Sequence, residues 1–155
     1  MKRREALKRL GALGLIATTA PSFASASNKK FCDVYTNYRP QIKNRNWMKI
    51  KYPKHPTKGE LKHTPDIKIS KTNQKGFNKI EITLGKNGII HPSSKEHYID
   101  FIEVYADNEL VGKTVFEPGE AMGYVSYNVK LNGAKTIKAV AGCNIHGIWE
   151  NTVSV

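Results

Sequence analysis

The second half of the chain alternates apolar and polar residues in short runs. The clearest are IEITL at 80–84 and YVSYNV at 124–129, and such alternation predicts strands that are buried on one face. Turn signals such as Asn132-Gly133 separate the runs. Short strands about ten residues apart, joined by such turns, are typical of an antiparallel all-β sandwich or barrel. The expected strands are 66–70, 78–84, 97–105, 110–116, 123–131 and 135–142.

Residues 27–60 have a different character. They are polar and basic, contain prolines at 40, 53 and 56, and show little periodicity. This composition predicts an irregular basic lead-in to a compact domain over 61–155. No helix with capping signals is expected after residue 26.

Residues 1–26 have the organisation of a secretory signal peptide. A basic head precedes an apolar run from Leu10 to Ala20, and small residues end at Ala26, the expected cleavage site. A membrane anchor is the alternative, but about eleven apolar residues cannot span about 30 Å of hydrocarbon. Arg3-Arg4 resembles a twin-arginine export signal. This resemblance implies the twin-arginine machinery as a partner and a periplasmic, exported location.

The formal net charge of +12 is unevenly distributed. Residues 27–80 hold fourteen Lys and Arg against three Asp and Glu, whereas residues 81–155 hold six against nine. Such a basic block is either a solvated face, a surface that binds a partner of a structural domain, or a means of steering a small anion. The acidic remainder and the expected export both argue against a nucleic-acid partner.

Metal-ligand residue types fall at the expected strand ends and loops. A lone histidine is more often a surface or core residue than a ligand, and His55 fits that interpretation. In a sandwich, however, loops from distant parts of the chain gather at one end, so one pocket could collect several donors. Cys143-x-x-His146 also places a sulfur and an imidazole about one metal diameter apart. The candidate donors are His63, His91, His97, Cys143 and His146.

The number and type of donors restrict which metal ion the site would bind. Five donors exceed the four of a structural zinc site, and iron accepts five with a sixth position open. A non-catalytic copper or iron electron-transfer module is the alternative; a copper site would use His91, Cys143 and His146, although no methionine follows His146. In an oxidising compartment, Cys32 and Cys143 would also suit a disulfide.

Four motifs, KHTP, HPSSKEHYIDFIEVYAD, FEPGE and CNIHGIWE, give the stretch from Lys62 to Val155 a family resemblance. It resembles the iron domain of superoxide reductases, known as desulfoferrodoxin and neelaredoxin. The resemblance implies an immunoglobulin-like antiparallel β-sandwich and one-electron reduction of superoxide to hydrogen peroxide. It also implies one iron ion with Cys143 as axial ligand and four histidines in a plane, namely His63, His91, His97 and His146.

The resemblance gives Lys62 a catalytic role, because the family carries a lysine there that attracts superoxide and helps its protonation. The family usually has a glutamate directly before this lysine, which closes the sixth position on oxidised iron. Here Leu61 takes that place and Glu60 comes one residue earlier. Either Glu60 still closes the position or water does; a one-residue offset reverses side-chain direction in an extended segment, which favours water.

The same resemblance implies partners. They are superoxide as substrate, an electron donor that is rubredoxin-like or another periplasmic redox protein, and further copies of the chain in a homo-oligomer. A rubredoxin-like iron site before the domain would need more cysteines than Cys32, so the single-iron type is expected.

Overall fold

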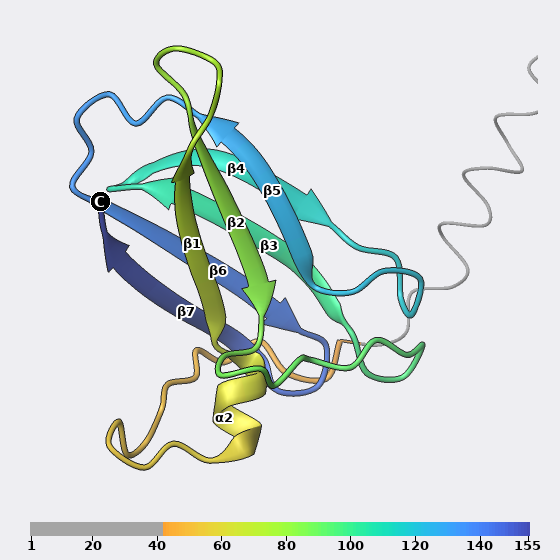
Figure 1. The fold of residues 1–155 in the computed structure, drawn as a ribbon. Coiled ribbons are helices and arrows are strands. Elements are labelled where there is room, and N and C mark those ends of the chain that lie inside the picture. The colour runs from red at the N-terminus through yellow and green to blue at the C-terminus, as the bar shows by residue number, and fades with distance from the viewer. Residues whose placement is uncertain (1–41) are drawn as a thin grey trace, which may run out of the picture. The chain divides into compact units, whose positions relative to one another are not determined.

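The computed structural model describes residues 42–155, and these residues form an all-β domain (Figure 1). Every strand pairing within its sheets is antiparallel, which confirms the predicted class. The elements are α2 (Lys58–His63), β1 (Pro65–Lys71), β2 (Asn78–Leu84), β3 (Ile99–Ala106), β4 (Glu109–Val115), β5 (Tyr124–Val129), β6 (Thr136–Cys143) and β7 (Gly147–Ser154).

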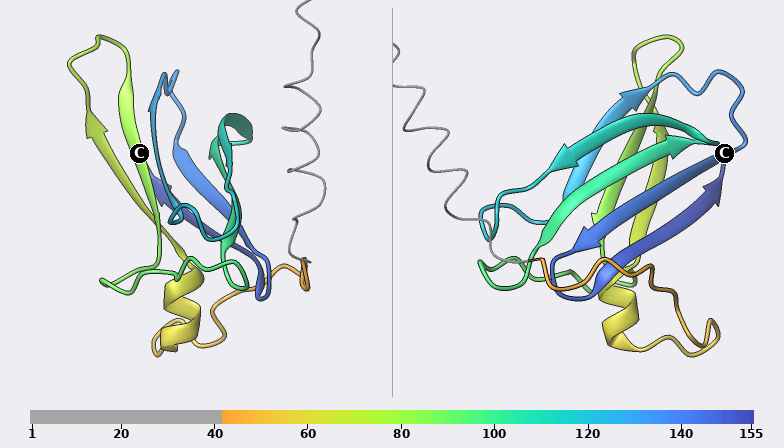
Figure 2. Two further views of the ribbon diagram at one scale, coloured as in Figure 1. Left: turned by 90° about the vertical axis from the view of Figure 1, so that its right-hand side faces the viewer. Right: turned by 180° about the vertical axis from the view of Figure 1, so that it is seen from behind.

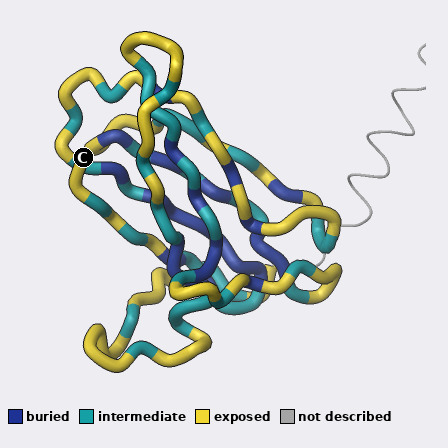
Figure 3. Tube along the Cα trace, in the orientation of Figure 1, coloured by how far each residue is buried: buried dark blue, intermediate teal, exposed yellow. Residues whose placement is uncertain are grey.

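The strands form two sheets that face each other (Figure 2). One has the order β1-β2-β5 and the other β4-β3-β6-β7. On β2, Ile80 and Ile82 are fully buried, whereas Glu81 between them is partly exposed, so the alternation in the sequence selects the inner face. Each such isoleucine contributes roughly 1.5–3 kcal/mol through burial. Figure 3 shows the buried segments along the strands and the exposed ones in the loops.

The six expected strands are all present, and each end lies within two residues of its expected position. The seventh strand, β7, was not expected. It pairs with β6 along its whole length, from Cys143–Gly147 to Thr136–Ser154. As the edge strand of its sheet it buries only Gly147 and Trp149, so its sequence lacks the apolar alternation of the other strands.

Helix α2 contradicts the expectation that no capped helix follows residue 26. Thr57 is its N-cap: the Thr57 hydroxyl accepts from the Glu60 backbone N–H at 3.2 Å, and the Glu60 carboxylate accepts from the Thr57 N–H at 2.7 Å. This reciprocal pair is a capping box, and its Thr-x-x-Glu signature is present in the sequence. The helix ends at His63, before Pro65, which cannot continue the hydrogen-bond ladder.

Residues 43–48, here called the strap, belong to the expected irregular segment. The strap has no regular element, yet it attaches to the turn between β6 and β7. The Lys43 N–H donates to the Asn144 carbonyl at 2.6 Å, and Trp47 forms an isolated parallel bridge with Ile148. Ordered contacts with the sheets therefore begin before residue 61.

The expected signal peptide over 1–26, its paired arginines and Cys32 lie outside the described residues. Between residues 42 and 155, no helix has both the length and the apolar character that crossing a membrane would require.

Candidate metal centre

The segments that carry the candidate donors, namely α2, the β2–β3 loop and the β6–β7 turn, meet at one end of the two sheets (Figure 1). His63 lies on the last turn of α2, and His91 and His97 lie in the loop between β2 and β3. Cys143 is the last residue of β6, and His146 lies in the turn that leads to β7. The fold thus brings all five predicted donors to the same region.

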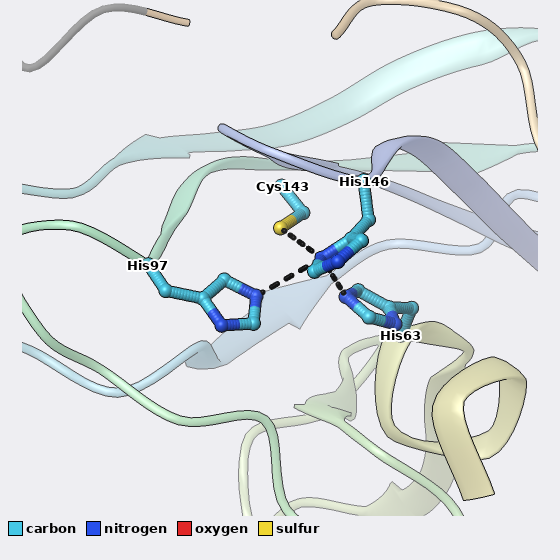
Figure 4. A group of neighbouring side chains, drawn as sticks. All are labelled: His63, His97, Cys143 and His146. Atoms are coloured by element: carbon cyan, nitrogen blue, oxygen red, sulfur yellow. Dashed lines mark hydrogen bonds between the residues drawn. The ribbon is translucent and has the colours of Figure 1, made fainter. Parts of the chain in front are cut away.

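Four of these side chains converge on one point (Figure 4). The Nδ1 atom of His146 lies 3.1 Å from Nε2 of His63, 3.1 Å from Nε2 of His97 and 3.6 Å from the Cys143 sulfur. The donor atoms of the four residues all lie within 4.8 Å of one another. Three imidazole nitrogens and a sulfur at these separations could hold a single metal ion.

His91 lies beside this group with an unpaired nitrogen. Its ring centroid is 4.7 Å from that of His63 and 4.6 Å from that of His97. Its Nδ1 lies 2.7 Å from the Pro92 carbonyl, so Nδ1 carries the proton and Nε2 keeps a lone pair. That Nε2 is buried and has no hydrogen-bond partner. An unsatisfied buried polar atom costs about 1–3 kcal/mol, and a metal ion would satisfy this one.

Neighbouring groups orient the donor rings. The Nδ1–H of His63 donates to the Gly59 carbonyl at 2.6 Å, which leaves its Nε2 lone pair facing His146. Trp149 stacks on His63 with ring centroids 5.2 Å apart, and its indole N–H donates to the His146 carbonyl at 3.1 Å. Hydrogen bonds to the far side of a ligand imidazole fix its tautomer and orientation.

Burial keeps the histidines neutral. It lowers the pKa of His63 to about 4 and that of His91 to about 3. Burial also lowers the pKa of His97 and His146, and the nearby Lys62 charge adds to the effect. Neutral imidazole is the form that binds metal ions, so at neutral pH these rings need not release protons first.

Cys143 carries a free thiol that is fully buried. Burial raises its pKa, while backbone hydrogen bonds from Ile145 and His146 oppose the rise. The two N–H groups favour a sulfur anion once a cation compensates its burial. Metal binding at Cys143 should therefore release a proton.

Asn144 is a structural residue of the centre that sequence reasoning missed. Its side-chain oxygen accepts from the Tyr98 N–H at 3.0 Å, and its amide donates to the Glu96 carbonyl at 2.8 Å. It is almost fully buried and ties the residues on both sides of His97 to the turn that carries Cys143. The only sequence signal was a short polar residue between the cysteine and the histidine of CNIH.

Lys62 borders an open groove beside the donors. The groove has a volume of about 340 Å³ and is also lined by His63, His146 and Trp149. The Lys62 charge acts on all four clustered histidines, since it lowers the pKa of each. The groove gives a small anion a path toward both the ammonium group and the donors.

Glu60 also borders this groove, but its carboxylate is fully engaged. One oxygen accepts from the Lys51 N–H at 2.7 Å, and the other accepts from the backbone and hydroxyl of Thr57. These hydrogen bonds, that of Lys51 first, lower the pKa of Glu60. The expected reason for excluding Glu60 was wrong, because Leu61 and Glu60 are neighbours on a helix and not in an extended segment.

The donor set fits iron better than the alternatives. A copper site made only of His91, Cys143 and His146 would leave out His63 and His97, whose nitrogens lie equally close to His146. A structural zinc site uses four ligands, whereas five donors gather here. Imidazole with thiolate also suits non-haem iron.

Residues 55–152 match the model of the desulfoferrodoxin family. The chain belongs to the desulfoferrodoxin family. A superoxide reductase of Pyrococcus abyssi is 36% identical over 109 residues, which cover 63% of this chain and 90% of the relative. A neelaredoxin of Megalodesulfovibrio gigas is 30% identical over 113 residues, covering 61% of this chain and 86% of the relative. The resemblance seen in the sequence motifs is thereby confirmed.

Solved structures agree with this membership in the desulfoferrodoxin family. A superoxide reductase of Giardia intestinalis described as 1Fe-SOR superimposes with a TM-score of 0.51 at 29% identity, over 61% of this chain and 98% of that chain. A hypothetical protein from Pyrococcus horikoshii gives a TM-score of 0.53 at 31% identity, over 61% and 89%. The family match begins at residue 55, so the strap precedes it.

Proposed function

We propose that this member of the desulfoferrodoxin family is a superoxide reductase. It would reduce superoxide by one electron, with uptake of two protons, to hydrogen peroxide, and release no oxygen. The observation that carries the proposal is the convergence of His63, His97, Cys143 and His146 beside the unpaired Nε2 of His91. These five residues would hold one iron ion, which supplies the electron when it is bound.

The chain's own groups have distinct tasks in this reaction. The neutral imidazoles would bind the cation without prior deprotonation, and the Cys143 sulfur would add electron density to it. The groove admits a small anion next to Lys62. The Lys62 ammonium attracts superoxide and donates a hydrogen bond to it, which favours its protonation to peroxide.

Positive charge near the groove supports a small anionic substrate. Residues 42–62 contain seven Lys and Arg side chains against one acidic residue, Glu60. A surface potential of one sign concentrates an oppositely charged substrate and raises its association rate by about 10–10³-fold at low salt. Superoxide is such an anion.

Three further features belong to the same proposal. Sheets of three and four antiparallel strands match the strand count of the immunoglobulin-like sandwich. The signal-like sequence over 1–26 supports export through the twin-arginine machinery to the periplasm. The electron donor would then be a rubredoxin-like or other periplasmic redox protein, and the enzyme a homo-oligomer.

Product stoichiometry tests the reaction. The purified protein is loaded with Fe²⁺, its metal content is measured, and it is mixed with a known amount of superoxide while oxygen and peroxide are followed. Reduction yields one hydrogen peroxide per superoxide consumed and no oxygen. A dismutase would yield about half as much peroxide and an equal amount of oxygen, and that result would reject the proposal.

The electron-transfer alternative gives a different result. A copper module would show a paramagnetic copper signal in the protein as purified, with no iron in metal analysis. It would also not catalyse superoxide consumption when an electron donor is supplied.

A further inference from the structure

The strap packs against residues 143–147, which carry two of the donors and are here called the ligand turn. On one side of the turn the Lys43 N–H donates to the Asn144 carbonyl at 2.6 Å. On the other side the Ile148 N–H donates to the Asn46 carbonyl at 2.8 Å, and the Met48 N–H donates to the Ile148 carbonyl at 2.8 Å. These bonds lie at Asn144, directly after Cys143, and at Ile148, two residues after His146, so the strap holds the backbone beside each of the two donors.

Gly147 shows how closely the strap approaches. Its φ of +86° lies in the left-handed region, where glycine carries no penalty. A Cβ at this position would overlap the Asn46 carbonyl oxygen and would lie 3.0 Å from Cγ of Met48. The strap backbone therefore lies directly on the ligand turn.

An ion pair links the strap to β3. The Arg45 guanidinium donates to both carboxylate oxygens of Asp100, with 3.2 Å between Nη1 and Oδ1 and a second bond from Nη2 to Oδ2. The Asp100 side chain is only 15% exposed and that of Arg45 35%. The guanidinium carbon also lies 5.7 Å from the centroid of the Phe101 ring. This two-pronged geometry is the arrangement that arginine and carboxylate favour.

Asp100 lies next to the donor end of β6. The pairing of β3 with β6 shifts register here: Ile99 faces Cys143 and Phe101 faces Gly142, which makes Asp100 the extra residue of a bulge. A Cβ on Gly142 would lie 2.6 Å from Oδ1 of Asp100. The carboxylate thus sits against the residue before Cys143, where its negative charge opposes a negative sulfur.

Arg45 is the cation that balances this carboxylate. A buried charge that loses its partner is costly, because little water reaches it. Without Arg45, one unbalanced negative charge would remain beside Cys143 and the strap would lose its side-chain link to β3. Without Asp100, one unbalanced positive charge would remain.

We propose that Arg45 and Asp100 are positioning residues of the metal centre, which set the charge beside Cys143 and hold the strap against the ligand turn. Arg45 and the strap precede the family match, which begins at residue 55, whereas Asp100 lies within it. The proposal rests on the proposed function only in requiring a metal ion at the centre, and it does not require superoxide as substrate.

Two variants that change the charge beside Cys143 in opposite directions test the proposal. Arg45→Met and Asp100→Asn are prepared as full-length protein, loaded with iron, and their midpoint potentials and sulfur-to-iron absorption bands are measured. Added negative charge stabilises the more highly charged metal state, so the potential should fall in Arg45→Met and rise in Asp100→Asn. Arg45→Lys should restore most of the parent value. Shifts in the same direction, or none, would overturn the proposal, because mere loosening has no reason to change sign.

A neighbouring ion pair provides the matched control. The Lys113 ammonium donates to the Glu103 carboxylate at 2.8 Å, and its nitrogen lies 5.9 Å from the centroid of the same Phe101 ring. Lys113 therefore resembles Arg45 in charge and in aromatic contact. Lys113→Met and Glu103→Gln should leave the potential and the band unchanged. Equal shifts in this pair would indicate a bulk charge effect and reject a role specific to Arg45 and Asp100.

An experiment with cobalt(II) tests this inference independently of the proposed function. Parent, Arg45→Met and Lys113→Met proteins are loaded with Co²⁺, and the rate of metal loss to a chelator is followed through the sulfur-to-cobalt band. Loss should be about tenfold faster in Arg45→Met only, the lower end of the effect of outer partners of metal ligands. Equal rates would contradict the proposal. A protein that fails to reduce superoxide yet shows this difference would reject only the proposed function.

Discussion

Nε2 of His63 and Nδ1 of His146 lie 3.1 Å apart, although 83 residues separate the two histidines. The His63 lone pair points toward His146, because the other nitrogen of His63 donates to Gly59. His97 Nε2 approaches the same His146 atom at the same distance. Three ring nitrogens that face one another need a proton or a cation between them, so this geometry is that of a cation site.

Replacing His91 should weaken metal binding although His91 lies outside the tightest group of four. His91→Ala removes the unpaired Nε2, and the affinity for Fe²⁺ or Co²⁺ should fall at least about tenfold, the loss that an outer partner of a ligand alone can cause. His55→Ala is the matched control, since His55 is exposed and is not a member of the donor cluster. Metal titrations of the two variants compare them. Equal affinities would mean that His91 is no ligand.

Cys143→Ser should remove the visible absorption of the oxidised iron protein. A thiolate bound to ferric iron absorbs visible light through charge transfer from sulfur, and a serine oxygen does not supply this band. The spectrum is recorded after mild oxidation, with the iron content of the same sample as control. A band that persists in iron-loaded Cys143→Ser protein would contradict sulfur ligation.

The alternating strands and the donor set could be read from the sequence because they depend on local pattern and residue type. Two elements were missed because their patterns are weak, although the capping box of α2 left a signature in the sequence. Helix α2 has only six residues, too few to show a helical period, and β7 is an edge strand with one large buried side chain, Trp149. The ion pair of Arg45 with Asp100 joins residues 55 positions apart, and no local pattern encodes such a contact.

Lys62→Met should slow the reaction with superoxide by about tenfold and weaken its dependence on ionic strength, because an attracting charge beside the groove is lost. Lys58→Met is the matched control: it removes the same charge from the same helix at an exposed position. Pulse radiolysis at several salt concentrations measures both effects. Identical rate constants for the two variants would make Lys62 an ordinary member of the basic surface.

Glu60→Ala should destabilise the protein without changing the oxidised iron spectrum. The Glu60 carboxylate accepts from the Thr57 N–H in the capping box of α2, and its loss leaves this N–H without that partner. Thr57→Ala breaks the same capping box from its other side and should also destabilise the protein, by about 1 kcal/mol. Denaturant unfolding gives the stability of each variant. A spectral shift in Glu60→Ala that Thr57→Ala lacks would show that the carboxylate reaches the metal.

The metal-free protein should lose stability as the pH falls below 6.5. The folded state holds the pKa of His63 at about 4 and that of His91 at about 3, against 6.5 as the ordinary value, so unfolding takes up protons in this window. Each histidine should contribute a slope that is about 0.7 kcal/mol per pH unit at pH 6.5 and approaches about 1.4 kcal/mol per pH unit near pH 5. Unfolding between pH 5 and 6.5, above the range in which carboxylates titrate, measures it. A flat profile would contradict the lowered pKa values.

Because Cys143 ends a strand in the interior of the four-stranded sheet, sulfur ligation depends on the docking of β6 between β3 and β7. In the other sheet, the pairing of β1 with β2 joins residues much closer in sequence, and these two strands lead to His63 and His91, whose ring centroids lie 4.7 Å apart. A refolding chain that has formed only that sheet would hold histidines and no thiolate. In a stopped-flow experiment, the rate at which the sulfur-to-metal absorption band appears would therefore report the rate at which β3 pairs with β6. Pairing between strands distant in sequence is slow to form.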